Sequence, residues 1–214
     1  MEIVQSIDKI TAWINENVCP NIVLKLPDDF QNGAGYKVGT VNPTAFPMYQ
    51  PGKDKLPPNV VAPFPSVVVQ LLEGSDTMTD HNRRLRLQLS FTAWNPGNHA
   101  QEMRSAVNTS PTIEENGLSF PVSDDADGAV SENTFKRDAD GWKDVWNFVD
   151  RALRDIENAE YINGLRVVKE LGITFGQFQE EGQISDIYPY WGAWAIFTIE
   201  SGLPRIGSAY SEFL

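Results

Sequence analysis

The residues that could carry out chemistry are few, and their spacing does not bring them together. Cys19 is the only cysteine, and His81 and His99 are the only histidines. Nucleophilic catalysis needs a nucleophile beside a base, and a metal site needs ligands at characteristic spacings. The sequence contains neither arrangement, and it has no G-x-S-x-G motif. We therefore expect no catalytic residue, no metal ligand and no cofactor, and we predict that the protein is not an enzyme.

One acidic segment resembles a calcium-binding loop without completing it. In the stretch S-D-D-A-D-G, Asp125 and Asp127 fall at positions 3 and 5 of an EF-hand loop, and Gly128 falls at position 6. The same register places Ser123 and Thr134 where the loop needs carboxylates. Because the ligand set is incomplete, we predict a solvated acidic loop.

Two further patterns resemble functional sites only in part. The glycines of residues 32–39, N-G-A-G-Y-K-V-G, are spaced two and then four apart, which matches neither the dinucleotide motif nor the phosphate-loop motif. The acidic pairs Asp124-Asp125 and Glu180-Glu181 could supply two carboxylates for acid–base catalysis, but they fall in turns flanked by glycine. Such positions are typical of solubilising charge, so we expect neither nucleotide binding nor hydrolysis.

The overall charge limits the classes of partner. The chain has 214 residues and a formal net charge of -12, whereas tight binding to nucleic acid depends on lysine and arginine neutralising phosphates. The same charge would let DNA pass through an acidic ring without binding to it. No apolar run approaches the roughly 18 residues that a membrane span needs, so we expect no membrane partner. A single cysteine excludes an internal disulfide and is typical of a reducing cytosol.

The strongest structural signal is the stretch R-L-R-L-Q-L-S-F-T-A-W at residues 84–94. Its apolar and polar residues alternate with a period of two, which predicts a strand with one buried face and one open face. Residues 66–73 are β-branched and apolar, so we expect them to pair with this strand in an antiparallel hairpin. The buried face carries Leu85, Leu87, Leu89, Phe91 and Ala93.

Two amphipathic helices are predicted. Residues 2–18 carry an isoleucine stripe at spacings of four, three and four. Residues 140–156 carry a second apolar stripe, with Asp140 as the expected N-cap. The two stripes consist of Ile3, Ile7, Ile10 and Ile14, and of Trp142, Val145, Val149, Leu153 and Ile156.

The rest of the chain contains two irregular insertions and three further strands. Residues 27–65 are rich in proline and glycine, and residues 95–140 are poor in apolar residues, so we expect little regular structure in either. Strands are predicted at residues 22–26, 165–175 and 188–201. One side of the second strand carries Leu165, Val167, Leu171, Ile173 and Phe175, and the core side of the last carries Trp191, Ala193, Ala195, Phe197 and Ile199.

The open face of the sheet is the candidate subunit interface. The last strand places aromatic and aliphatic residues there, where a solvated strand would carry polar ones, and exposed aromatic patches mark protein interfaces. The candidate interface residues are Arg84, Arg86, Gln88, Tyr190, Trp194 and Ile196. The alternative is that the proline-rich insertion covers the aromatic residues within the same chain.

The order of these elements and several phrases of sequence resemble a known family. The helix G-W-K-D-V-W-N-F-V-D-R-A-L-R and the final strand Y-P-Y-W-G-A-W, which leads to S-G-L-P, are similar to those of tail terminator proteins of long-tailed bacteriophages and prophages. The resemblance implies a single α+β domain over residues 1–214, with a mostly antiparallel sheet and two helices packed on one face.

The same resemblance implies a function in virion assembly. In that family a homohexameric ring caps the completed tail tube, stops polymerisation of the tube protein and meets the head completion or connector protein. DNA would pass through the lumen without specific binding, and the protein would assemble in the host cytoplasm and end in the virion tail. The alternatives are another neck or baseplate component, an acidic hydrolase or a ligand-binding protein.

Neither EDTA nor ATP is expected to change the melting temperature of the protein, because the acidic loop lacks two calcium ligands and the glycine-rich segment lacks phosphate-binding spacing. Thermal unfolding with and without each compound measures this. A calcium-dependent stabilisation of more than about 1 kcal/mol would restore the metal-binding interpretation.

Overall fold

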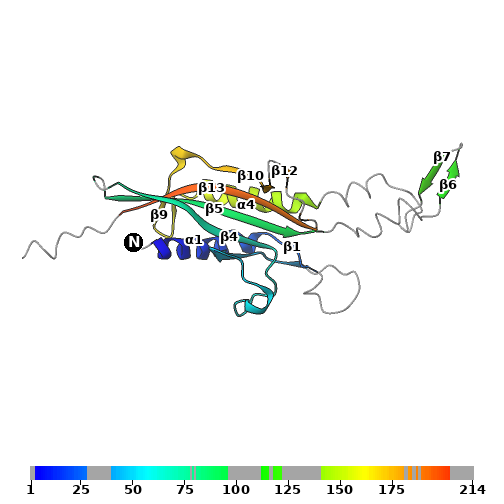
Figure 1. Cartoon of the computed structure of the whole chain (residues 1–214), viewed down its shortest axis with the longest axis horizontal. Helices are drawn as coiled ribbons and strands as arrows, with labels where there is room; N and C mark the ends of the chain where they lie inside the picture. The colour runs from blue at the N-terminus through cyan, green and yellow to red at the C-terminus, as the bar shows by residue number, and fades with distance from the viewer. Residues whose placement is uncertain are drawn as a thin grey trace, which may run out of the picture.

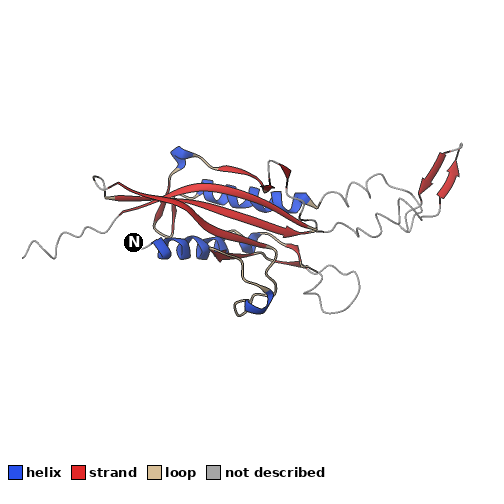
Figure 2. Ribbon diagram, viewed as in Figure 1, coloured by secondary structure: helices blue, strands red, loops and turns tan. Residues whose placement is uncertain are grey.

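The molecule has two layers, a central sheet and a pair of long helices on one of its faces (Figures 1 and 2). This arrangement confirms the predicted α+β class with a mostly antiparallel sheet. The computed structural model describes residues 3–27, 40–77, 79, 81–95, 112–115, 118–121, 141–180, 183–184, 187 and 189–202.

The central sheet contains seven strands in the order β3-β4-β5-β13-β9-β8, and β10 also pairs with β13. Every pairing is antiparallel except that of β3 with β4. The bounds are β3 Thr44–Pro47, β4 Ser66–Thr77, β5 Asn82–Trp94, β8 Tyr161–Ile162, β9 Leu165–Val167, β10 Thr174–Gln177 and β13 Tyr190–Gly202.

The other elements of the described residues are two helices, three short strand pairs and three 3-10 turns. The helices are α1 Ile3–Asn17 and α4 Trp142–Asn158. The strand pairs are β1 Leu24–Lys25 with β2 Thr40–Val41, β6 Thr112–Glu115 with β7 Leu118–Pro121, and β11 Gln179–Glu180 with β12 Gln183–Ile184. The 3-10 turns are η1 Cys19–Asn21, η3 Lys53–Lys55 and η4 Lys169–Leu171.

The core lies between the sheet and the helices. The register of β5 and β13 places a small side chain opposite a large one at two core positions, since Ala193 lies opposite Phe91 and Ala195 lies opposite Leu89. The ring of Phe91 meets Phe148 of α4 edge-on at 5.0 Å between centroids. The predicted apolar face of β5 is buried throughout, because each of its five apolar residues is at most 1% exposed.

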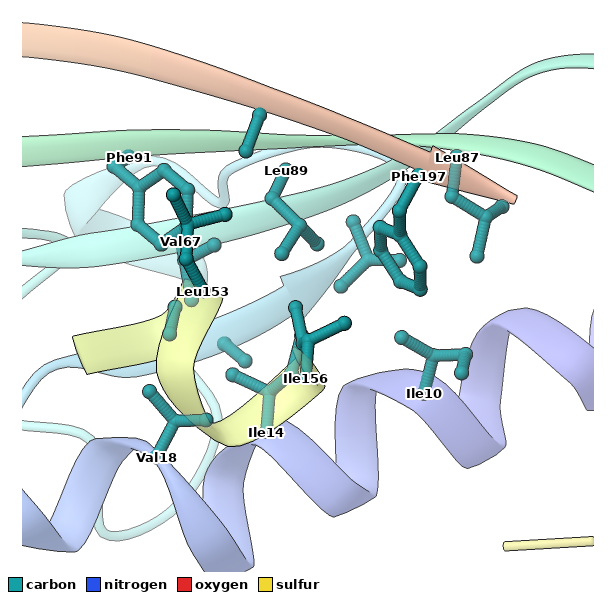
Figure 3. Close-up of a cluster of buried hydrophobic side chains, with 14 of the residues drawn as sticks. Ile10, Ile14, Val18, Val67, Leu87, Leu89, Phe91, Leu153, Ile156 and Phe197 are labelled. Atoms are coloured by element: carbon teal, nitrogen blue, oxygen red, sulfur yellow. The ribbon is translucent and has the colours of Figure 1, made fainter. Parts of the chain in front are cut away.

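Both helices point their apolar stripes at the same side of the sheet. Figure 3 shows Ile10 and Ile14 of α1 and Ile156 of α4 directed toward Leu87 and Phe197 of the strands. Burying an aliphatic side chain of this size contributes about 1.5–3 kcal/mol each. The two predicted stripes therefore do close the core, except at their N-terminal residues.

The first residue of each stripe is more exposed than expected. Ile3 is 38% exposed and Trp142 is 41% exposed, so the prediction that Trp142 lines the buried face is wrong. A helical side chain leans toward the N-terminus of its helix, which carries the side chain of a first residue past the packed turns. The N-cap of α4 is Gly141, which makes no side-chain cap hydrogen bond, and Asp140 lies outside the described residues.

The predicted strand at residues 165–175 is two strands. β9 ends at Val167, the 3-10 turn η4 follows, and β10 begins at Thr174. The break occurs at Gly172, whose φ of 67° lies in the left-handed region that glycine adopts without strain. As a result Leu171 and Phe175 are 60% and 54% exposed rather than buried.

The predicted insertions contain strands that the sequence pattern did not indicate. β3 lies in the proline-rich insertion and adds an edge strand to the sheet, parallel to β4. β6 and β7 form a hairpin inside the acidic insertion. The predicted strand at residues 22–26 shortens to β1, with two residues.

The β4–β5 hairpin extends beyond the core and contains a bulge. Leu71 lies opposite Leu87 and Glu73 lies opposite Arg86, so Leu72 is an extra residue in β4. β3 pairs only with Ser66–Val69 of β4. Among the described residues, no strand pairs with the same edge of β4 beyond the bulge.

Leu87→Asp is expected to lower the free energy of unfolding by about 3–5 kcal/mol, because it places an unpaired carboxylate in the core. Gln88→Asp, one residue along β5 on the open face, should cost only about 1 kcal/mol, from lost hydrogen bonds. Denaturant titrations of the two variants measure the difference. Equal stabilities would contradict the assignment of the two faces.

Candidate subunit interface

The face of the sheet opposite the two helices carries most of the predicted interface, and we call it the outer face. The register of β5 and β13 makes the predicted residues neighbours: Ile196 lies opposite Gln88, and Trp194 lies opposite Ser90, two residues further along β5. Arg84 and Arg86 continue the same row toward the tip of the β4–β5 hairpin.

Ion pairs organise the end of the outer face nearest the hairpin tip. The carboxylate of Glu200, only 11% exposed, accepts hydrogen bonds from Arg84 Nε at 3.1 Å and from Arg166 Nη1 at 2.9 Å. Arg166 also pairs with Glu170 in η4. The hydrogen bond to Glu200 raises the pKa of Arg166, so the guanidinium stays charged. Glu200 therefore ties together β5, β13 and β9.

The ion pair between Arg86 and Glu73 is more exposed than those of Glu200. Arg86 Nη1 lies 3.1 Å from Glu73 Oε1, and the two side chains are 47% and 67% exposed. Exposed pairs of this kind contribute about 0–1 kcal/mol. Breaking the ion pair between Glu73 and Arg86 therefore costs little free energy.

Polar side chains occupy the middle of the outer face. Ser90 Oγ donates to Gln70 Oε1 at 2.8 Å, and Gln88 Nε2 donates to Ser90 Oγ at 2.9 Å. This cluster joins β4 to β5 through side chains as well as through the backbone. It also fixes Gln88, so this predicted interface residue has partners inside its own subunit.

The aromatic end of the outer face is partly covered. The ring of Tyr190 lies 4.8 Å from that of Phe64, which belongs to the proline-rich insertion. Trp194 Nε1 donates to Gln177 O at 2.9 Å, and its indole lies over Gly176, where an added Cβ would come within 2.9 Å of the ring. The alternative prediction, that the insertion covers the aromatic residues, therefore applies to Tyr190.

A groove runs along the charged end of the outer face. Its volume is about 550 Å³, and it opens to solvent. The residues that matter for its chemistry are Glu73, Arg84, Arg86, Leu171, Thr174 and Ile196. We call it the outer-face groove.

Sequence reasoning did not find the acidic partners of the predicted arginines. Glu73 and Glu200 occupy the polar positions opposite Arg86 and Arg84, so the alternation of their strands contained the signal. Finding them requires the strand register, because Arg84 and Glu200 are 116 residues apart in the chain.

The chemically reactive residues do not form a site in the described part of the chain. Burial raises the pKa of Cys19 to about 12, so its thiol stays protonated and is a poor nucleophile. His81 is exposed at the hairpin tip. Within the described ranges, no three histidine, cysteine or acidic side chains gather as metal ligands, and no helix is long and apolar enough to cross a membrane. His99, the acidic loop and residues 32–39 lie outside the described residues.

Comparison with known proteins does not place the chain in a family. No protein-family model matches the sequence, and no curated protein matches it significantly.

Glu200→Gln is expected to lower the free energy of unfolding by about 1–2 kcal/mol, because it weakens two charge-assisted hydrogen bonds at a nearly buried carboxylate. Glu73→Gln serves as the matched control and should change stability by less than about 0.5 kcal/mol, since its pair is exposed. Chemical denaturation of both variants tests the comparison. A larger loss of stability for Glu73→Gln would contradict the assignment of Glu200 as the carboxylate that links β5, β13 and β9.

Proposed function

We propose that the protein is a tail terminator of a long-tailed phage or prophage, a structural subunit that caps the completed tail tube as a ring. The observation that carries the proposal is the two-sided sheet. One face is closed by both helices, and the other combines exposed ion pairs with half-buried apolar residues. Subunit contacts likewise combine apolar and aromatic residues with arginine and other polar side chains.

The asymmetry of this surface supports a ring. A contact between two different patches repeats around an axis until it closes, and closure gives a cyclic oligomer. The proposed ring is a hexamer, on the strength of the resemblance of the 141–154 helix and the final strand. It would stop polymerisation of the tail tube protein on one side and meet the head completion or connector protein on the other.

The net charge of -12 also fits this role. DNA must pass through the ring during packaging and ejection, and an acidic lumen lets it pass without tight binding. Such a protein needs no active site and no cofactor. In this proposal it assembles in the host cytoplasm and ends in the virion tail.

Trp194→Glu is expected to prevent completion of tails in a phage complementation assay and to yield tubes of uncontrolled length. The substitution places a carboxylate at the aromatic end of the outer face. It also removes the hydrogen bond to Gln177 O, so the melting temperature must be measured and should fall only slightly.

Trp142→Glu is the matched control. Trp142 is a partly exposed tryptophan on the helix layer, and glutamate is well tolerated in the first turn of a helix. The control should support tails of normal length. Normal virions that contain Trp194→Glu protein would refute the outer face as the assembly surface.

A further inference from the structure

Part of the proline-rich insertion forms an arm that projects from the body of the subunit (Figure 1). We define the arm as residues 48–63, which lie between β3 and β4. Met48 N donates to Val69 O at 2.8 Å, which attaches the arm to the sheet, and Gln50 Nε2 donates to Pro63 O at 2.6 Å, which joins its two limbs. Because proline also restricts the backbone of the arm, a partner that binds it has few residues to order.

The exposed surface of the arm combines apolar and basic side chains. Met48, Tyr49 and Val61 are 46%, 73% and 59% exposed. Lys53 and Lys55 are exposed on the 3-10 turn η3 between the two limbs. Tyrosine and methionine are enriched at protein interfaces. This composition fits a protein surface that carries both apolar and acidic residues.

Charge favours a second copy of this chain as that partner. The arm contains two lysines and one aspartate, a net charge of +1, so the remainder of the chain carries -13. Two copies of so acidic a protein repel each other unless basic residues of one meet acidic residues of the other. Complementary charge across an interface steers association and fixes the register of the contact.

The solvent face of α1 carries residues that complement the arm. Val4 is 65% exposed, and the exposed residues Asp8, Ala12 and Glu16 follow it at intervals of four. Residues four apart are neighbours on one side of a helix. Neither Asp8 nor Glu16 has an ion-pair partner among the described residues. The face therefore offers two carboxylates beside small apolar side chains.

We infer that the arm of one subunit binds the solvent face of α1 in a second copy of this chain, with Lys53 and Lys55 against Asp8 and Glu16. The inference rests on the proposed function, since the contact would join neighbours in the ring. The arm and the α1 face are different patches, so the contact is head-to-tail, the kind that closes rings.

The test is a charge swap in the full-length protein, read by sedimentation velocity over a range of concentrations. The arm reversal is Lys53→Glu/Lys55→Glu, and the helix reversal is Asp8→Lys/Glu16→Lys. Each should weaken self-association by on the order of tenfold, because each replaces attractions by repulsions. The variant that combines all four substitutions should restore association.

The control for net charge is Lys143→Glu/Arg154→Glu. It makes the same change in net charge as the arm reversal, at two exposed positions of α4. Association should fall much less in this control than in the arm reversal. An equal loss in both would show that net charge alone governs association, and would overturn the arm contact.

Tyr49→Ala tests the apolar part of the arm without changing its charge. It should weaken self-association by on the order of tenfold, because exposed tyrosines at a contact contribute strongly to binding. Tyr161→Ala is the matched control, since Tyr161 is 58% exposed on β8, and it should leave association unchanged. Melting temperatures of all variants should stay near that of the wild type, because every substituted side chain is exposed.

Mixing the arm reversal with the helix reversal separates contacts between copies from contacts within one copy. The reversed arm of one variant meets the reversed α1 of the other, and the unchanged arm meets the unchanged α1. The mixture should therefore associate as the wild type does. If the combined variant associates and the mixture does not, the arm docks on its own subunit and the inference fails.

The arm contact and the proposed function can fail separately. A wild-type chain that stays monomeric at every concentration, or reversals that leave association unchanged, overturns the arm contact whatever the tail-length assay shows. Association restored by the mixture, together with normal tails from Trp194→Glu, would keep the arm contact and reject the outer face as the assembly surface.

Discussion

The pairing of β5 with β13 is the constraint on which most of the structure depends. The two strands pair without interruption from Trp94 opposite Tyr190 to Asn82 opposite Gly202. Because successive side chains point to opposite faces, this register decides which residues meet the helices and which form the outer face. A slip of one residue would exchange the two sets. The register is fixed because a slip would expose the apolar residues of β5 and bury its arginines.

Local periodicity predicts the parts of the fold that are built from long regular segments. The alternation in β5 and the stripes of α1 and α4 name residues that are buried, apart from Ile3 and Trp142, because a helix or strand of that length has one apolar side to bury. The stripes did not name Phe148 and Ala152, which are also buried in the core. The short elements depend on contacts far along the chain. β3 exists only through its pairing with β4, and the break after β9 depends on the backbone conformation of Gly172.

In the candidate interface, too, features of a single strand could be predicted, whereas contacts between distant strands could not. The open row of Arg84 and Arg86 could be predicted from β5 alone, whereas their carboxylate partners come from β4 and β13. The result is a surface in which arginine and glutamate nearly balance within an otherwise acidic chain. Salt at moderate ionic strength screens exposed pairs such as Arg86 with Glu73 more than it screens the nearly buried Glu200.

The bulge at Leu72 has a consequence for how the protein behaves at high concentration. A strand edge with unpaired backbone groups attracts other strands and can seed aggregation. Beyond the bulge, no described strand pairs with the edge of β4, yet the extra residue increases its twist. The ion pairs of Glu73 with Arg86 and of Asp76 with Arg83 place charged side chains beside it. A flat strand from a neighbouring molecule cannot follow that edge for long. The same irregularity therefore works against edge-to-edge pairing of subunits at this strand.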